Sequence, residues 1–263
     1  MVISGEVPEF CGCAGYIIMS RSRGYVKYKE LITPIHLGNM PFQNPFPDAC
    51  CFAADKNGIL LTNVHPLEIE IGNTFLSASR RAEFFSGRRC AHVSMKAAGY
   101  PRLPILRHHD RSPLWPLNVL GSITHGASLA AGIIRKPHQR LIGLGIDIED
   151  LSREVRSDIT RYTLTPWERD RWPVLSDRLS REARIIFSIK ETIYKCFFPI
   201  DRVTLGFQDA EVTDITDTSF KAQLLKNPFT RSIPTPIALE GKLQFYENAV
   251  FSALSESDRF LNW

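Results

Sequence analysis

The stretch that decides the fold is residues 143–149, with the sequence GLGIDIE. From residue 145 on, glycine or an acidic residue alternates with isoleucine. This alternation is typical of a β-strand, in which successive side chains point to opposite faces. Ile146 and Ile148 then point into the core, whereas Asp147 and Glu149 share the other face. Two neighbouring carboxylates repel each other, and a hard divalent cation with oxygen ligands would remove that repulsion. Taken alone, the pair fits an edge strand with a solvated acidic face better than a metal site.

A second segment, residues 187–195 with the sequence FSIKETIYK, changes this balance. The spacing predicts a helix over 180–198 and places Phe187, Glu191 and Lys195 along one ridge of it. An exposed Glu–Lys pair on a helix would contribute only about 0.3–0.5 kcal/mol to stability. On an exposed helix, these charges would need no further explanation.

The predicted helix is, however, too apolar to be exposed. Its isoleucines leave little of its surface for water: Ile185, Ile186, Ile189 and Ile193. Charged side chains on a largely buried helix need either oppositely charged partners or a functional role. Glu191, meeting Asp147 and Glu149, would complete a magnesium site that keeps places open for water and phosphate.

The remaining signals predict an α+β protein in two similar halves, residues 1–140 and 141–263, each with a small antiparallel sheet and a long helix. In the first half we expect that helix over 77–98. Strands are expected at 59–71, 119–123, 129–134, 141–148, 210–212, 238–245 and 249–254. The tetrapeptide FSGR at 85–88 resembles FSIK at 187–190, at the same place on the two long helices. This match is a weak indication of an internal duplication.

Particular residues mark other boundaries. Thr165, Pro166 and Glu168 predict a capping box with proline at the first helical position. Pro199 is expected to end the long helix of the second half. Residues 1–57 are rich in proline, glycine and aromatic residues and predict mainly loop.

The two segments together closely resemble the paired signature of the phosphopantetheinyl transferase superfamily. That signature is G-(V/I)-D-(I/V)-E, followed by (W/F)-(S/x)-x-K-E-(A/S)-x-x-K. Thr192 replaces the usual alanine or serine, and Phe187 stands where many members have tryptophan. Neither departure removes a metal ligand or a charge. The resemblance implies a pseudo-dimeric fold and an enzyme that moves 4′-phosphopantetheine from coenzyme A to a serine of an apo acyl, peptidyl or aryl carrier protein, releasing 3′,5′-ADP.

The resemblance also implies roles for individual residues. Asp147, Glu149 and Glu191 would hold Mg²⁺ at the pyrophosphate of coenzyme A. Glu191, or a water on the metal, would take the proton from the carrier serine. Lys195, with Lys190 nearby, would neutralise or protonate the leaving phosphate.

The first half resembles the siderophore-associated, enterobactin-type branch of the family. Residues 79–91, SRRAEFFSGRRCA, are similar to its helix pattern (K/R)-R-x-x-E-F-x-x-x-R-x-x-A. Arg80 and Arg88 are eight residues apart and share a face of the predicted helix. Such a pair of arginines usually belongs to a basic helix surface that faces solvent. The resemblance instead favours both as clamps for the 3′-phosphate of coenzyme A, because guanidinium binds phosphate bidentately.

A later segment of the first half resembles the same branch. PLWP at 113–116 and GSITHG at 121–126 are similar to its P-x-W-P…G-S-(I/L)-(S/T)-H segment. A single histidine after a strand is more often structural. The resemblance implies that Thr124 and His125 lie at the coenzyme A phosphates.

The loop before this segment carries a basic phosphate contact in the family. We assign that contact to Arg107, with Arg111 as the alternative. The sequence HHD at 108–110 has no further ligand at helical or strand spacing, so we interpret it as loop and not as a transition-metal site.

Composition sets the broad class. The chain has 263 residues, of which 44% are hydrophobic and 23% charged, as in an ordinary soluble globular protein. Its formal net charge of +4 is too small to indicate nucleic-acid binding, and it suits phosphate ligands and acidic carrier proteins. No stretch approaches the ~20 apolar residues of a membrane span, no secretory signal is visible, and the cysteines fit no disulfide framework. We therefore expect a cytoplasmic protein, and a monomer.

Two other functions fit the same residues. One is a magnesium-dependent phosphate or nucleotide hydrolase, although the sequence has no P-loop of the G-x-x-x-x-G-K-[ST] type. The other is a non-catalytic binding module for coenzyme A or a carrier protein. The intact set Asp147, Glu149, Glu191 and Lys195 argues against that module. The sequence does not choose among fatty-acid, polyketide and siderophore-peptide carriers.

Overall fold

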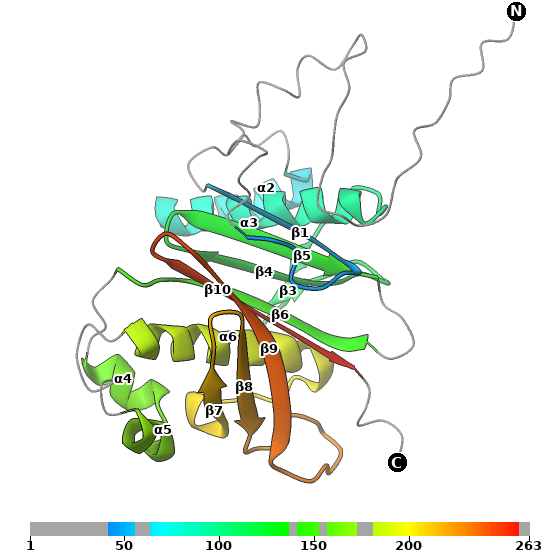
Figure 1. Ribbon diagram of the computed structural model, residues 1–263. Coiled ribbons are helices and arrows are strands. Elements are labelled where there is room, and N and C mark those ends of the chain that lie inside the picture. Colours follow the sequence, from blue (N-terminus) through cyan, green and yellow to red (C-terminus); the bar gives the residue numbers. More distant parts are fainter. Residues whose placement is uncertain (1–41, 56–63, 137–140, 153–156, 173–180, 258–263) are drawn as a thin grey trace, which may run out of the picture.

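The computed structural model describes residues 42–55, 64–136, 141–152, 157–172 and 181–257 (Figure 1). The first half contains β1 (Ala49–Asp55), α2 (Pro66–Asn73), α3 (Ala78–Ala97), β2 (Leu106–Arg107), β3 (Pro113–Leu114), β4 (Leu120–Gly126) and β5 (Leu129–Arg135). The second half contains β6 (Leu141–Asp150), α4 (Ser157–Thr163), α5 (Pro166–Arg171), α6 (Arg181–Asp201), the 3₁₀ turn η4 (Phe207–Asp209), β7 (Ala210–Ile215), β8 (Ser219–Leu224), β9 (Ile237–Tyr246) and β10 (Ala249–Ser257).

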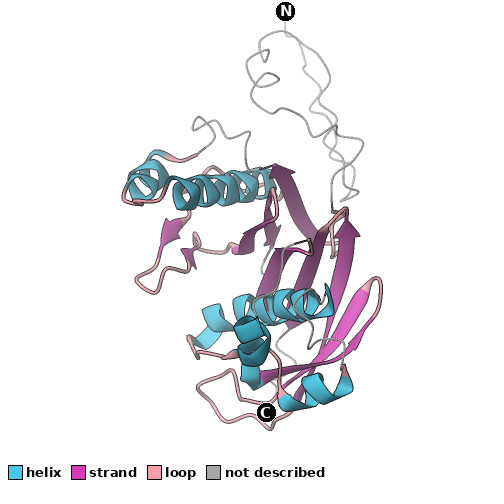
Figure 2. Cartoon of the chain, turned by 90° about the vertical axis from the view of Figure 1, so that its left-hand side faces the viewer, coloured by secondary structure: helices cyan, strands magenta, loops and turns pink. Residues whose placement is uncertain are grey.

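Two sheets and two long helices form four layers. One sheet has the strand order β1-β5-β4 and the other β6-β10-β9-β8-β7, while β2 and β3 pair separately. An apolar core lies between α3 and the first sheet, another between the two sheets, and a third between the second sheet and α6. Figure 1 shows α3 above the first sheet and α6 behind the second, and Figure 2 shows the same layers from the side.

The two halves repeat one order of elements. In the first half, the strand β1 is followed by the short helix α2, the long helix α3 and the hairpin of β4 and β5. In the second half, the strand β6 is likewise followed by the short helix α5, the long helix α6 and the hairpin of β9 and β10. The sheet orders β1-β5-β4 and β6-β10-β9 correspond as well. The turn of each hairpin contains a residue with a positive φ angle of 50°, which is Ala127 in the first half and Glu247 in the second. The predicted α+β architecture of two similar halves is confirmed, whereas the separate tasks assigned to residues 1–140 and 141–263 stay a prediction.

α2 is a helix, not the strand that its apolar residues predict. It begins with a capping box, in which the Glu68 carboxylate accepts a hydrogen bond of 3.0 Å from the amide of His65, and Pro66 occupies the first turn. These start signals outweigh the strand-like alternation, so the strand expected over 59–71 is wrong for all of its described residues, 64–71. Residues 56–63 lie outside the described part of the chain.

α6 differs from its prediction at one end. It continues through Pro199 to Asp201, although proline was expected to end it. Proline so close to a C-terminus costs the helix only one amide donor. The predicted capping box of α5, made by Thr165 and Glu168, is confirmed. None of the described helices combines the length and apolar character that a membrane crossing requires.

Two glycines let the layers approach closely. A Cβ atom on Gly145 would lie 2.1 Å from the carbonyl oxygen of Thr192, and one on Gly126 would lie 1.8 Å from that of Ile148. Glycine at the first position lets α6 lie against β6. Glycine at the second lets β4 of the first half lie against β6 of the second. These approaches bring β4, β6 and α6 to one place.

Candidate active site

Asp147 on β6 lies where the two halves meet, and it is 4% exposed. Its Oδ1 atom accepts hydrogen bonds from Nζ of Lys195 at 2.6 Å and from Oγ1 of Thr124 at 3.0 Å. Its Oδ2 atom is buried as well but has no hydrogen-bond partner among the described residues. A buried carboxylate oxygen without a partner is costly unless a ligand binds it.

Hydroxyl groups join β4 to β6, which are edge strands of different sheets. The amide of Ile146 donates to Oγ of Ser122 at 3.1 Å, and that of Ile148 donates to Oγ1 of Thr124 at 3.3 Å. These hydroxyls satisfy amides that an edge strand would otherwise leave unpaired. Thr124 is 3% exposed. Its predicted place at the coenzyme A phosphates does not fit this position, where it holds Asp147 and β6.

Two further carboxylates lie beside Asp147. Burial, and next the charge of Asp147, raise the pKa of Glu149 to about 7. Burial also raises the pKa of Glu191, with Lys195 opposing this shift and Asp147 adding to it. Raised pKa values in neighbouring carboxyl groups mean that added positive charge would stabilise their ionised forms.

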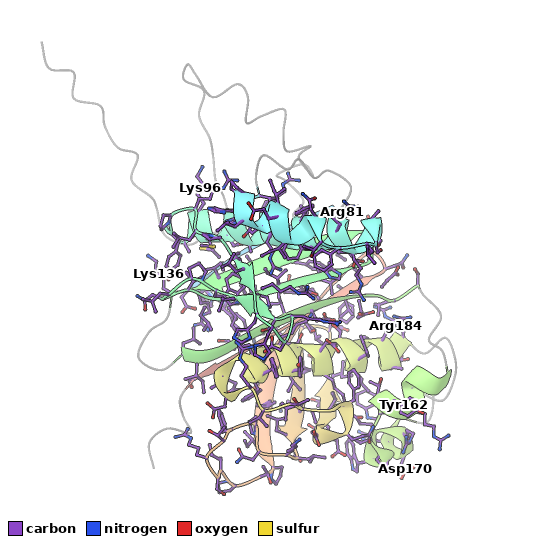
Figure 3. All side chains as sticks on the ribbon, turned by 180° about the vertical axis from the view of Figure 1, so that it is seen from behind. Arg81, Lys96, Lys136, Tyr162, Asp170 and Arg184 are labelled. Atoms are coloured by element: carbon purple, nitrogen blue, oxygen red, sulfur yellow. The ribbon has the colours of Figure 1, made fainter. Side chains whose placement is uncertain are left out.

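Arg184 is a residue of this group that the sequence interpretation missed. Its Nη1 atom donates to Oε2 of Glu149 at 3.0 Å. It precedes Glu191 by seven residues, two turns of helix, and that spacing could have revealed it. Figure 3 shows Arg184 near the start of α6. Two cations of α6 therefore face the acids of β6, Arg184 at Glu149 and Lys195 at Asp147.

The donor set fits a hard divalent cation such as Mg²⁺. All the candidate ligand atoms are carboxylate oxygens, and Oδ2 of Asp147 is buried without a partner in the described chain. Lys195 binds Asp147 and Arg184 binds Glu149, however, and the three carboxylates do not converge on one point. In the described ranges, the group whose ligand atoms all lie within 4.8 Å of one another is a different one, His108, His109 and Asp110.

That histidine–aspartate group has positive neighbours and is not a good cation site. Asp110 accepts hydrogen bonds from the hydroxyl of Ser112 at 2.6 Å and its amide at 2.9 Å, and it also contacts Arg202. The Ser112 hydroxyl, and to a smaller extent Arg202, lower the pKa of Asp110 to about 2. Arg107 and Arg111 flank the group in sequence. We interpret it as part of a basic loop, as the sequence predicts.

Lys190 does not lie at the acidic group, contrary to the prediction. It is 3% exposed. Its Nζ atom donates to Oε2 of Glu168 at 2.7 Å and to the carbonyl oxygens of Thr163 at 2.7 Å and Phe207 at 2.8 Å. All three ammonium hydrogens are therefore used. Adjacent helical residues point about 100° apart, so Glu191 can face β6 while Lys190 ties α6 to α5 and η4.

Two predicted phosphate contacts lie around one carboxylate of α3. Nη1 of Arg80 is 4.0 Å from Oε2 of Glu83, and Nδ1 of His125 is 3.9 Å from Oε1. The Arg80 side chain is 72% exposed and that of His125 36%. A soluble ligand can therefore reach both.

Arg88 and Arg107, the other two predicted phosphate contacts, lie on an aromatic platform. The guanidinium of Arg88 is 4.2 Å from the ring centroid of Phe84, and that of Arg107 is 5.1 Å from the ring of Phe75. The two ring centroids are 5.3 Å apart. Burial lowers the pKa of Arg88 to about 10, with Glu68 opposing the shift and Arg107 adding to it. A bound anion would relieve the repulsion between the two guanidinium groups.

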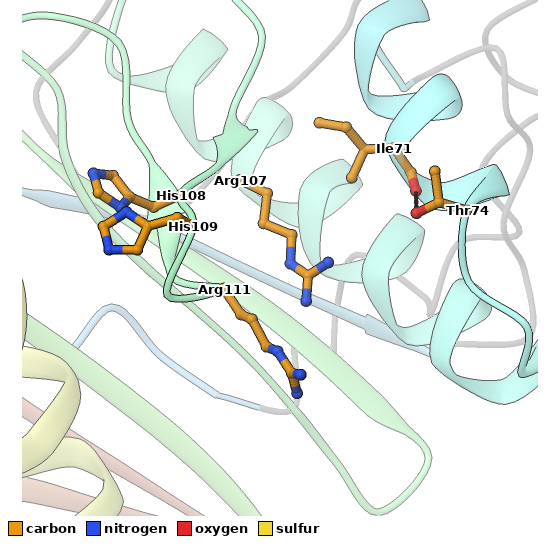
Figure 4. Close-up of a pocket in the computed structure, with 6 residues that line it drawn as sticks. All are labelled: Ile71, Thr74, Arg107, His108, His109 and Arg111. Carbon is orange, nitrogen blue, oxygen red and sulfur yellow. Dashed lines mark hydrogen bonds between the residues drawn. The ribbon is translucent and has the colours of Figure 1, made fainter.

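A pocket of about 430 Å³ opens beside Arg107. It is lined by Ile71, Thr74, Arg107, His108, His109 and Arg111. In Figure 4 the guanidinium groups of Arg107 and Arg111 extend to the same side of their loop, away from the two imidazoles. Their positive charge and many donors suit a phosphate-bearing ligand.

Comparison with known proteins relates this arrangement to a family. The family described as 4′-phosphopantetheinyl transferase N-terminal domain matches residues 76–135, and the 4′-phosphopantetheinyl transferase superfamily matches residues 143–238. The 4′-phosphopantetheinyl transferase PptT of Mycobacterium tuberculosis is 30% identical over 183 residues, which cover 67% of this chain and 79% of PptT. The chain belongs to the 4′-phosphopantetheinyl transferase superfamily.

Other members of the superfamily are similar to this chain. Npt of Nocardia iowensis, also a 4′-phosphopantetheinyl transferase, is 29% identical over 67% of this chain and 82% of its own length. Enterobactin synthase component D of Salmonella typhi is 34% identical over 56% of this chain and 60% of its own length. The predicted resemblance to the superfamily, with a relative of the enterobactin type, is confirmed. The two matched regions lie in different halves. The first spans α3 to β5, and the second spans most of β6 and continues through α6 to β8.

Proposed function

We propose that this protein transfers 4′-phosphopantetheine from coenzyme A to a serine hydroxyl of an apo carrier protein. The observation that carries the proposal is the unpartnered, buried Oδ2 atom of Asp147. It lies beside two carboxyl groups of raised pKa, Glu149 and Glu191. It also lies where the two halves meet, each of which matches a phosphopantetheinyl transferase region.

Asp147, Glu149 and Glu191 would hold Mg²⁺ in this proposal. When bound, the ion would neutralise negative charge on the pyrophosphate of coenzyme A. Oδ1 of Asp147 is already occupied by Lys195 and Thr124, which leaves Oδ2 as its ligand atom. Arg184 keeps Glu149 in place by donating to its Oε2 atom.

Glu191 takes the proton of the carrier serine. Burial raises its pKa, and a carboxylate of raised pKa is a better base near neutral pH. The serine oxygen forms a bond to the β-phosphorus while the bond from that phosphorus to the bridging oxygen breaks. The bridging oxygen keeps the electron pair and leaves with 3′,5′-ADP. Lys195, which contacts Asp147 but is partly exposed, offsets the charge of this leaving group.

The basic residues of the first half bind the 3′-phosphate end of coenzyme A. Arg80 is exposed, His125 is partly exposed, and both lie around Glu83. Arg107 lines the pocket, and Arg88 lies on the aromatic platform and binds the two carbonyl groups that precede Arg107. Arg88 therefore acts mainly through its charge and by supporting the loop, and not as the open clamp that the sequence predicts.

The partner is an acidic carrier domain, and the protein acts as a cytoplasmic monomer. A net charge of +4 supports attraction between the two proteins. The test is to incubate the protein with apo-carriers of the fatty-acid, polyketide and peptide types, coenzyme A and Mg²⁺. We expect 3′,5′-ADP and modified carrier in equal amounts, and neither with a carrier whose serine is replaced by alanine. Nucleotide release without carrier modification would indicate a hydrolase instead, and binding without either product would indicate a binding module.

A further inference from the structure

Glu68 of α2 is a fully buried carboxylate with an unusual number of partners. It is 0% exposed. Its two oxygens accept from Nε2 of His92 at 2.9 and 2.8 Å. Oε1 also accepts from the amide of Ile105 at 2.7 Å, and Oε2 accepts from the amide of His65 at 3.0 Å. Capping α2 needs only the bond to His65, so the other bonds require a separate explanation.

The bond to Ile105 anchors the segment that carries Arg107. Nε of Arg88 donates to the carbonyl oxygen of Ile105 at 3.3 Å, and Nη2 donates to that of Leu106 at 3.1 Å. Three backbone groups just before Arg107 are thus held by side chains of α2 and α3. The strand pairing here is minimal, since β2 has two residues. Side chains therefore fix this segment more than the sheet does.

The pKa of Glu68 indicates that its hydrogen-bond partners favour the ionised carboxylate. Burial alone would raise its pKa, but the hydrogen bond and charge of His92, with the amides of Ile105 and His65, outweigh burial and lower it. The ionised carboxylate is therefore stabilised in the fold. α2 also supplies Ile71 and lies next to Thr74, which line the same pocket as Arg107. One short helix thus forms a wall of the pocket and holds the loop across from it.

The second half contains a matched counterpart. Glu168 of α5 is also 0% exposed and also closes a capping box. It accepts from Nζ of Lys190 on the long helix at 2.7 Å and from the amide of Val212 on the following strand at 2.7 Å. Each half thus uses a buried glutamate to tie a short helix, a long helix and a later segment. Only in the first half does that segment lead into the basic pocket.

We propose that Glu68, held by His92, is a positioning residue for coenzyme A: it fixes residue 105 so that Arg107 faces the coenzyme A phosphate. This inference rests on the proposed binding of coenzyme A phosphate by Arg107. Neither residue touches the ligand. Apart from any loss of stability, their effect on the reaction should therefore be confined to coenzyme A affinity and pass through Arg107.

The test compares Glu68→Gln with Glu168→Gln, the same change at the matched site, by calorimetric titration of the full-length protein with coenzyme A. Each loses a buried charge, so we expect both to unfold at lower temperature. Only Glu68→Gln should weaken coenzyme A binding, by about tenfold, with a raised KM and an unchanged kcat. Equal affinity in Glu68→Gln and the parent would overturn the proposal.

A double variant shows whether the effect passes through Arg107. Arg107→Ala should weaken coenzyme A binding, and adding Glu68→Gln should weaken it no further. Additive losses would refute a positioning role. If Arg107→Ala itself binds coenzyme A normally, the phosphate assignment fails, and the positioning proposal fails with it. Carrier modification by the parent protein tests the transferase function separately.

Hydrogen exchange on the parent protein keeps the inference testable if Glu68→Gln does not fold. The amide of Ile105 should be protected, because Glu68 accepts its hydrogen bond. The control is the matched amide of Val212, which Glu168 holds. Rapid exchange at Ile105 with protection at Val212 would show that Glu68 does not hold the loop.

Discussion

Thr124 of the first half donates a hydrogen bond of 3.0 Å from Oγ1 to Oδ1 of Asp147 in the second half. The same hydroxyl oxygen accepts from the amide of Ile148 and from Nζ of Lys195. One buried hydroxyl thus joins the halves and directs one oxygen of Asp147 away from any ligand. The proposed site depends on this contact, because neither half alone forms it.

Removing this hydroxyl should affect both stability and transfer. Thr124→Val keeps the side-chain volume but leaves the amide of Ile148 and one oxygen of Asp147 with fewer partners. We expect the free energy of unfolding to fall by about 1–3 kcal/mol and the rate of carrier modification to fall with it. Urea denaturation and turnover measure the two effects. Thr124→Ser should recover most of both. A valine variant with parental stability and turnover would contradict this account.

Glu191 and Lys195 should be separable by their effects. Glu191→Gln keeps the shape, so the fold should survive, while the rate should fall by roughly 10²–10⁴-fold on loss of the base, and further with lost metal affinity. Lys195→Ala should slow transfer but not reduce metal affinity, because an ammonium group is no metal ligand. Carrier modification and thermal melting of both variants check this. If both transfer at the parental rate, the assigned roles are wrong.

Removal of divalent cations should stop the reaction. The three carboxylates lie close enough for Asp147 to raise the pKa of Glu149 and of Glu191, and a dication would offset that repulsion. Treatment with a chelator should abolish carrier modification, and added Mg²⁺ should restore it. Full activity in metal-free buffer would rule out the proposed ligand set.

Glu68 should make the protein sensitive to acid. Its pKa in the folded state lies below the ordinary value of 4.5. The stability that it contributes is therefore fully present above about pH 4.5 and is lost as the pH falls through the folded pKa. Glu68→Gln should be less stable than the parent at pH 7, and the difference should shrink as the pH falls below 4.5. Urea unfolding at a series of pH values measures it. If the difference in the free energy of unfolding between the two proteins does not change with pH, the pKa of Glu68 is not altered by folding.

The local parts of the fold and site follow from the sequence. The acids of β6 and the ridge of α6 are set by short-range periodicity, so Asp147, Glu149, Glu191 and Lys195 could be found without a structure. The capping residues of α3 and α5 are likewise local signals. The match of FSGR to FSIK also indicated the repeated architecture that α3 and α6 show.

Relations between distant segments do not follow from the sequence. Lys190 adjoins Glu191, but which neighbour it meets depends on how α5 packs on α6. Thr124 lies in a motif associated with phosphate, yet its place is set by two edge strands that meet. β1 pairs with β5 about eighty residues later, so short-range patterns give little sign of it. Arg88 has the predicted helical spacing but is covered by the loop that it binds.

The central claim is that Asp147 belongs to a metal-dependent site that transfers phosphopantetheine. The most direct measurement is the intact mass of an apo carrier after incubation with coenzyme A and Mg²⁺, for the parent and for Asp147→Asn in parallel. Asparagine keeps the shape and can still bond Thr124, so the variant should fold. The account predicts that the parent adds one phosphopantetheine group to the carrier and that Asp147→Asn adds none over the same period. A carrier left unmodified by the parent, or modified equally fast by Asp147→Asn, would contradict it.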